Sequence, residues 1–151
     1  MSQLVERLKE TDVAAWLALA AEVQDLFGAE MANDPLFRDW VTRSIARGAA
    51  YCVRIDGEVA GVIQYRNGRI NWLAVGHRFH RRGVGRALVT HALASGDPVV
   101  RVTTFGEGDP HPEASAARAL YQALGFAPSQ EHAEPAPDGT PRTVLIWYHS
   151  T

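Results

Sequence analysis

Residues 70–89 read INWLAVGHRFHRRGVGRALV, an apolar run followed by a basic stretch with two glycines and then an amphipathic run. This order predicts a β-strand, a loop and an α-helix. The first turn of a helix has unpaired backbone N–H groups and a partial positive charge, and Arg81, Arg82 and Arg86 add cations there. Gly83 and Gly85 would let a ligand approach the backbone closely. The stretch therefore predicts a binding site for a polyanion at the start of this helix.

Two common phosphate-binding motifs do not fit this loop. A dinucleotide fingerprint needs a third glycine where this chain has Leu88, and it follows its strand directly, whereas about eight residues separate Val75 from Gly83. A P-loop needs glycine, lysine and then serine or threonine, and the sequence contains no such tripeptide. The loop is therefore a phosphate site of another class, or its arginines only form a solvated approach to the helix.

The loop resembles the acyl-CoA pyrophosphate loop of the GNAT superfamily of N-acetyltransferases. The pattern of that loop is Gln or Arg, two residues, Gly, one residue, and then Gly or Ala. Gly83 and Gly85 take the glycine positions, and His80 stands where the family has Gln or Arg. A histidine can still donate a hydrogen bond. The departure alters the first side-chain contact and leaves the backbone amides unchanged.

A second match strengthens the resemblance. Residues 116–126 read AARALYQALGF, similar to the family's helix that carries Leu-Tyr and ends at Leu-Gly-Phe. Leu120, Tyr121 and the run Leu124, Gly125, Phe126 fall on those positions. The resemblance covers most of the chain, although the first third is matched only by its predicted elements.

The resemblance implies acetyl-CoA as cosubstrate, with Tyr121 as the general acid for the departing thiolate. The strand before the loop would offer backbone groups to the pantetheine arm. Ala114 stands where the family often has Asn, so that contact would be displaced to Ser115. The expected cofactor-binding residues are Leu73, Ala74, Val75, His80, Arg81, Arg82, Gly83, Val84, Gly85, Arg86, Ser115, Arg118 and Tyr121. The alternative role for Tyr121 is packing of its ring on the sheet.

The general base does not follow from the resemblance. Some family members carry Glu four residues before the position of Leu73, where this chain has Arg69. The loop after the next strand offers Glu107, Asp109 and His111, of which we take Glu107 as the working candidate, and a base acting through water is an equal alternative. We expect no metal, because the two histidines near the arginines lack an acidic or cysteine partner.

Apolar periodicity and turn residues predict the remaining elements. Asp56-Gly57 and Asn67-Gly68 predict two hairpins. Strands are expected at 4–8, 49–55, 58–66, 69–75, 99–105 and 142–148, with a short strand after 126, and helices at 12–27, 35–47, 84–95 and 115–124. We expect Thr11 and Asp12 to cap the first helix and Asn33 and Asp34 to start the second, and residues 69–105 to form a parallel crossover. The result is an α/β fold: one domain, residues 1–151, with a mixed, mainly antiparallel sheet of six to seven strands flanked by helices, as in GNAT-like proteins.

Composition excludes several classes of protein. The net charge of −2 gives no general attraction to nucleic acid, and no apolar stretch approaches the ~18 residues of a membrane span. A single cysteine, Cys52, excludes an internal disulfide and indicates a reducing compartment, so we expect a cytoplasmic protein. The resemblance implies an N-acetyltransferase that acts on an amine of a small molecule or protein by direct transfer, with a homodimer as an option. A noncatalytic acyl-CoA-binding sensor module is the alternative.

Overall fold

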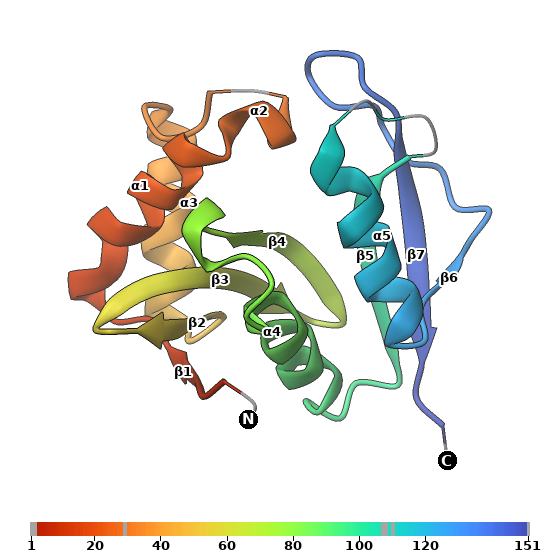
Figure 1. Ribbon diagram of the computed structural model, residues 1–151, viewed down its shortest axis with the longest axis horizontal. Coiled ribbons are helices and arrows are strands. Elements are labelled where there is room, and N and C mark those ends of the chain that lie inside the picture. The colour runs from red at the N-terminus through yellow and green to blue at the C-terminus, as the bar shows by residue number, and fades with distance from the viewer. Residues whose placement is uncertain (1–2, 29, 107–108, 110, 151) are drawn as a thin grey trace.

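The computed structural model describes residues 3–28, 30–106, 109 and 111–150. In this part of the chain, seven strands form one sheet in the order β1-β2-β3-β4-β5-β7-β6 (Figure 1). The strands are β1 (Val5–Arg7), β2 (Ala50–Ile55), β3 (Glu58–Arg66), β4 (Arg69–Val75), β5 (Val99–Phe105), β6 (Ala127–Pro128) and β7 (Arg142–Tyr148). The α-helices are α1 (Val13–Glu22), α2 (Gln24–Phe27), α3 (Pro35–Ala46), α4 (Val84–Leu93) and α5 (Pro112–Ala123), with short 3-10 helices η1 (Glu10–Asp12) and η2 (His77–Phe79). Of the neighbouring strand pairs, β4 with β5 is parallel and the other five are antiparallel, which confirms the predicted mixed sheet.

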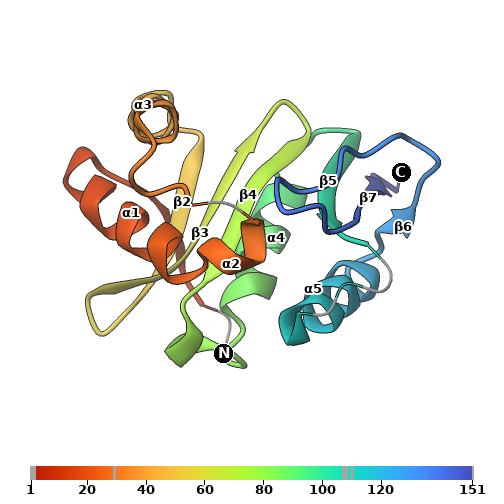
Figure 2. The same ribbon diagram turned by 90° about the horizontal axis from the view of Figure 1, so that it is seen from above.

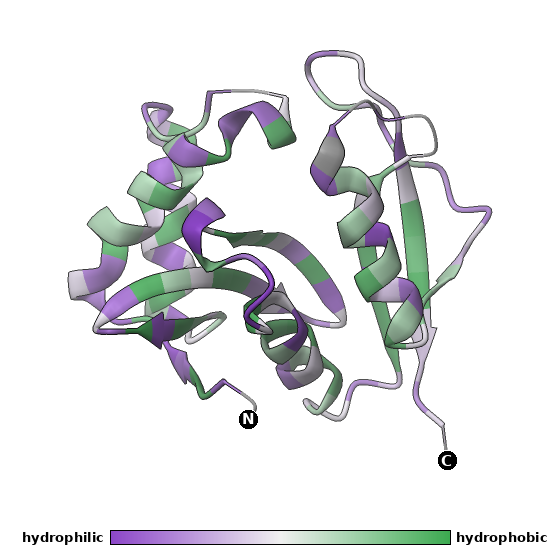
Figure 3. Ribbon diagram, in the orientation of Figure 1, coloured by the Kyte–Doolittle hydropathy of each residue, from purple (hydrophilic) through white to green (hydrophobic). Residues whose placement is uncertain are grey.

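Helices cover both faces of this sheet (Figure 2). One buried cluster joins the sheet to α4 and α5, and a second joins the other face to α1 and α3. Colouring by hydropathy shows the apolar character of the strands and the hydrophilic segment between β4 and α4 (Figure 3). Burial of these two apolar layers is the main source of stability for such a fold.

Local signals in the sequence are mostly confirmed. Both residues of the Asp56-Gly57 and Asn67-Gly68 turns have positive φ, as a type I′ hairpin turn requires. The side chain of Asp34 caps α3 by accepting from the Leu36 N–H at 2.9 Å. The predicted helix at 115–124 begins earlier, at Pro112, because proline suits the first turn.

Two predictions near the first helix are wrong. The helix expected to continue to residue 27 is interrupted at Val23 and resumes as α2. Asp12 precedes α1 but does not cap it with its side chain. Its carboxylate accepts hydrogen bonds from the Lys9 N–H and from both terminal nitrogens of Arg54 instead. A charged partner gives a stronger hydrogen bond than a neutral backbone N–H, so the ion pair with β2 prevails.

A bulge in β4 changes which face its side chains occupy. Along β3, Tyr65 pairs with Ile70 and Gln64 pairs with Trp72, so Asn71 is an extra residue. Ile70 consequently packs in the cluster beneath α4 and α5, and Trp72 packs in the cluster beneath α1 and α3. In a regular strand these two residues would share one face.

The same region of β4 is where β4 and β5 separate. Their pairing is limited to Arg69 with Arg101 and Ile70 with Val102. β5 remains paired along its whole length with β7 on its other side. The later part of β4 therefore pairs with β3 alone, and its backbone toward β5 is left open for another extended chain.

Candidate functional site

A cleft of about 650 Å³ occupies the space where β4 and β5 part. Its walls come from β4, β5, the end of η2 with the loop after it, the start of α4, one face of α5, Val23 between α1 and α2, α2 itself and the first residue of β7. Most residues expected to bind a cofactor line it, namely Leu73, Ala74, Val75, His80, Arg81, Gly83, Val84, Gly85, Arg86 and Tyr121. Residues from distant parts of the sequence thus meet at one opening in the sheet.

The two glycines at the start of α4 serve different purposes. Gly83 adopts a left-handed conformation with φ of 78°, and a Cβ placed there would have no atom within 4 Å. It therefore opens the approach to the first helical turn, which no side chain caps. A Cβ on Gly85 would lie 3.3 Å from Cδ2 of Leu120 on α5. Gly85 thus allows the two helices to pack closely.

The arginines beside this turn divide into two pairs. Arg81 and Arg86 line the cleft, and neither forms an ion pair with a described residue. The guanidinium carbons of Arg78 and Arg82 lie 4.7 Å and 5.9 Å from the centre of the Phe79 ring, and neither residue lines the cleft. Of the two expected arginines in the loop itself, Arg81 lines the cleft. Arg82 lies over the Phe79 ring and does not line the cleft.

His80 connects the loop to the strand before it. Its Nε2 lies 3.1 Å from the carbonyl oxygen of Val75, at the end of β4. With Nε2 protonated, the ring donates to that carbonyl and holds the loop against the strand. The histidine that replaces the family's Gln or Arg therefore binds the protein's own backbone at the edge of the cleft.

The cleft-facing side of α5 follows helical spacing. Its lining residues are Glu113, Ala116, Ala117, Leu120 and Tyr121. Ser115 and Arg118 lie off this face and do not line the cleft, so the structure does not bring these two expected contacts to it. The sequence analysis missed Glu113, which stands eight residues before Tyr121 and shares its helical face. Among the described lining residues it is the one carboxylate.

Tyr121 combines a buried ring with a free hydroxyl. The residue is 3% exposed, and its ring packs edge-to-face on Phe126 with centroids 5.3 Å apart. The hydroxyl makes no hydrogen bond with any described residue. Burial raises the pKa of the Tyr121 phenol, so it stays protonated at neutral pH. Tyr121 is therefore available as a hydrogen-bond donor to a group bound in the cleft.

Comparison with known proteins identifies the family of this chain. The family model described as acetyltransferase (GNAT) domain matches residues 46–128, more than half of the chain. The chain belongs to the GNAT family. Membership supports acyl-CoA-dependent acetyl transfer as its general activity. No curated protein sequence matches the chain at a significant level.

Solved GNAT structures share the fold along the whole chain. A GNAT-family acetyltransferase from Bacillus cereus is 17% identical, with a TM-score of 0.77 and full coverage of both chains. The PaiA N-acetyltransferase from Thermoplasma acidophilum, solved with coenzyme A, is 14% identical, with a TM-score of 0.68 over 99% of this chain and 100% of that one. The ribosomal-protein-S18-alanine N-acetyltransferase from Escherichia coli is 19% identical, with a TM-score of 0.67 over 99% and 95%.

The expected base residues of this GNAT domain have different outcomes. Glu107 lies outside the described residues. The Asp109 side chain is fully buried and accepts from the His111 N–H at 2.9 Å, from His111 Nδ1 at 2.6 Å and from Arg142 Nη1 at 3.3 Å. Burial disfavours its charge, but these partners lower the pKa of Asp109 overall. Asp109 thus pairs with Arg142 and holds its guanidinium in place. Arg142 lines the cleft, although the sequence analysis missed it. Its Nη2 also donates to the Leu26 carbonyl at 2.9 Å.

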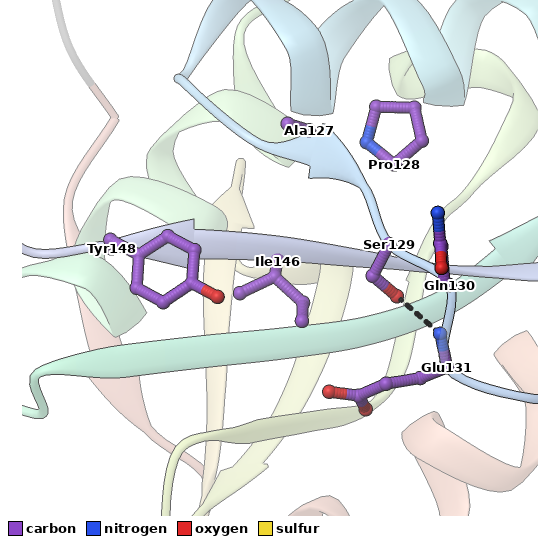
Figure 4. A pocket seen from close by; sticks show the side chains of 7 residues that line it. All are labelled: Ala127, Pro128, Ser129, Gln130, Glu131, Ile146 and Tyr148. Carbon is purple, nitrogen blue, oxygen red and sulfur yellow. Dashed lines mark hydrogen bonds between the residues drawn. The ribbon is translucent and has the colours of Figure 1, made fainter.

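A second hollow of about 430 Å³ lies at the outer edge of the sheet, along β6 and β7 (Figure 4). It is lined by Ala127, Pro128, Ser129, Gln130, Glu131, Ile146 and Tyr148. The Ser129 hydroxyl accepts from the Glu131 N–H there at 3.2 Å, which closes a local turn. None of the expected GNAT site residues lies in this hollow.

In the described part of the chain, no helix has the length and apolar character needed to cross a membrane.

Proposed function

We propose that the chain is an acetyl-CoA-dependent N-acetyltransferase that moves an acetyl group directly to an amine of a small molecule or protein. The observation that carries this proposal is the opening between β4 and β5, which joins the uncapped start of α4 to the free hydroxyl of Tyr121. A long thioester with a phosphorylated end could bind its phosphates at the start of α4 and place its thioester near the Tyr121 hydroxyl.

Acetyl-CoA fits this cleft in a definite order. Its pyrophosphate would bind the backbone N–H groups at the start of α4, with Arg81 and Arg86 as charged partners. Its pantetheine arm would run beside β4 in place of the missing β5 partner and bond to the backbone of 73–75. The thioester would then lie near Tyr121. The remaining expected contacts, Arg82, Ser115 and Arg118, would act from outside the cleft lining.

The reaction forms one C–N bond and breaks one C–S bond. The neutral amine attacks the thioester carbon, and the sulfur leaves as a thiolate. A thiol has a pKa of about 8.5, and burial raises the Tyr121 pKa above its ordinary value, so full proton transfer from the phenol is uphill. We propose that the Tyr121 hydroxyl mainly stabilises the thiolate by donating a hydrogen bond. Glu107 or a water molecule would accept the proton of the amine.

The substitution Tyr121→Phe tests this role. It keeps the ring that packs on Phe126 and removes the hydroxyl, so acetyl-CoA affinity by calorimetry should stay constant. Release of CoA thiol in the presence of an amine should fall on the order of 100-fold to 10,000-fold in kcat. The loss should be uniform from pH 6 to 9, because the phenol stays protonated throughout this range.

The matched control is Tyr148→Phe, which removes the hydroxyl of an exposed tyrosine at the far edge of the sheet and should change nothing. Equal turnover by Tyr121→Phe and the parent chain would make Tyr121 a packing residue. Acetyl-CoA binding without turnover on any amine would favour the sensor module instead.

A further inference from the structure

The cleft reaches both faces of the sheet, and its two halves differ in chemistry. On the α4 and α5 face lie the start of α4 and Tyr121. On the other face lie Phe27, Asn71 and Trp72, and Trp72 belongs to the cluster beneath α1 and α3. If acetyl-CoA fills the first half, the second half is left for the acceptor.

Asn71 presents an unpaired carbonyl oxygen in the half of the cleft that is left for the acceptor. Its Nδ2 donates to Oε1 of Gln64 at 2.8 Å, and Gln64 Nε2 donates to the Ser44 hydroxyl at 3.2 Å. Gln64 and Ser44 are each 3% exposed, and Ser44 lies on α3, so this relay places the Asn71 side chain on the α3 face. The relay uses one of the two N–H groups of Asn71 Nδ2 and thereby fixes the orientation of the amide. Its Oδ1 has no hydrogen-bond partner among the described residues and is left to accept one.

Aromatic side chains line the same half of the cleft. The rings of Phe27 and Trp72 stack with centroids 5.1 Å apart and an interplanar angle of 9°. Val23 and Leu26 line the cleft next to them. Burial of an apolar ligand group against such a surface is favourable in proportion to the area removed from water.

The charges of the cleft disfavour an acceptor that carries several positive charges. The lining carboxylate among the described residues, Glu113, projects from α5 on the opposite face. Asp109, nearby, is buried and engaged by His111 and Arg142. Among the described lining residues, the charged group on the acceptor side is Arg142, whose guanidinium carbon lies 5.1 Å from the Phe105 ring centre. Among these described residues, a polyamine or a basic peptide would meet a cation there and no free anion.

The wide end of the opening is crossed by a bridge. Arg142 at the start of β7 donates to the Leu26 carbonyl of α2 at 2.9 Å. A Cβ on Gly28 would lie 2.8 Å from Cγ of Asp138, in the loop that leads into β7, and Figure 2 shows this loop reaching toward α2. The bridge favours an acceptor small enough to enter whole over an extended polypeptide.

We propose that the acceptor is a small primary amine with an apolar carbon skeleton, which assumes the N-acetyltransferase function above. The skeleton lies on the half-buried ring of Phe27, which stacks on the buried Trp72, and the amine donates one N–H to Oδ1 of Asn71. The nitrogen lone pair then forms the C–N bond, the C–S bond breaks, and the second proton passes to solvent or the base. A neutral amide oxygen orients the amine without stabilising its protonated form as a carboxylate would. This matters because only the neutral amine can attack.

The test measures acetyl transfer through the release of CoA thiol. Three probe amines are compared: 2-phenylethylamine, spermidine, and a short peptide with a free N-terminal alanine. For the parent chain, kcat/KM should be at least about tenfold higher with 2-phenylethylamine than with the other two, the ratio that one well-placed interaction supplies.

Variants at position 71 separate its oxygen from its shape. Asn71→Leu keeps the branched shape of this exposed residue and removes its oxygen and its N–H groups. It should raise KM for 2-phenylethylamine about tenfold, with a smaller change in kcat and an unchanged acetyl-CoA affinity by calorimetry. Asn71→Asp loses the same N–H to Gln64 but keeps an acceptor oxygen, so KM for 2-phenylethylamine should rise less than in Asn71→Leu, while spermidine should improve. Asn33→Leu, the same change at an exposed asparagine before α3, is the control and should change neither constant.

Each contrary result has a separate meaning. Preference for spermidine or the peptide would overturn the proposed acceptor class and leave acetyl transfer intact. An unchanged KM in Asn71→Leu would overturn the role of Asn71. Absence of acetyl-CoA binding would overturn the proposed function itself, and this acceptor assignment with it.

Discussion

At the scale of single residues, Gly83 and Gly85 show that one short motif can contain two physical requirements. Gly83 has a positive φ and empty space in front of it, whereas Gly85 lies where any side chain would push against Leu120 of α5. The first requirement concerns the backbone and a ligand, and the second concerns helix packing. A substitution at Gly83 should therefore impair ligand binding, whereas a substitution at Gly85 should impair the packing of α4 on α5.

Gly83→Asn tests the first requirement. Asparagine tolerates a positive φ better than other side chains, so the fold should persist where a β-branched valine would add strain. The new side chain would occupy the space in front of the helix start, and acetyl-CoA affinity by calorimetry should fall about tenfold or more. Gly57→Asn is the matched control, because Gly57 also has a positive φ, of 80°, and no atom within 4 Å of its Cβ position. Equal acetyl-CoA affinities for the two variants would show that the pyrophosphate does not bind in front of Gly83.

At the scale of elements, an ion-paired group joins β1, η1 and β2. The Arg54 guanidinium donates to both carboxylate oxygens of Asp12 and also pairs with Glu6. The hydrogen bond from Arg54 is the main cause of the lowered pKa of Asp12, and the Lys9 N–H adds to it against the opposing effect of burial. Because Asp12 is largely buried, removing one partner of this pair should destabilise the fold more than breaking a surface ion pair does.

Asp12→Asn should lower the free energy of unfolding by about 2 kcal/mol at pH 7, measured by urea denaturation. The folded-state pKa lies below the unfolded value of about 3.9, so the stabilisation is complete above that value and is lost as pH falls through the folded-state pKa. The difference between variant and parent should therefore shrink as the pH falls below about 3.9. Glu131→Gln, at the more exposed pair with Arg101, should cost no more than about 1 kcal/mol. Equal losses in the two variants would contradict this account.

At the scale of the whole molecule, the sheet consists of two parts held together at one end. β1 to β4 form one part and β5, β7 and β6 the other, with two residue pairs between β4 and β5. The Arg142 bridge to α2 connects the parts at the other end. A ligand that fills the opening would add contacts to both parts at once.

Acetyl-CoA at 100 times its Kd should stabilise the protein by about 2.7 kcal/mol, which corresponds to a rise in Tm of roughly 5 to 10 °C. Backbone amides of 73–75 should exchange hydrogen more slowly in the complex, while those of the β2–β3 hairpin should not change. Adenosine 3′,5′-bisphosphate, which lacks the pantetheine arm, is the control and should leave exchange in β4 unaltered. Protection of β4 by this control would mean that the arm does not pair with the strand.

The sequence by itself determined the features that depend on neighbouring residues. Alternating apolar residues and the Asp56-Gly57 and Asn67-Gly68 turns predicted the strands, and the loop before α4 together with residues 116–126 indicated the GNAT family. These signals are local, because a turn, a helix start or a strand face is set within a few residues.

The tertiary structure alone decided how those elements meet. The bulge at Asn71, the parting of β4 from β5 and the bridge from Arg142 to α2 all depend on pairing between segments far apart in the chain. For the same reason the sequence did not show that Ser115 and Arg118 lie off the cleft-lining face of α5 and that Glu113 lies on it, since which face of α5 meets the cleft is set by its packing on β5. A residue's type and spacing determine what chemistry it can perform, whereas long-range packing determines whether it reaches the site.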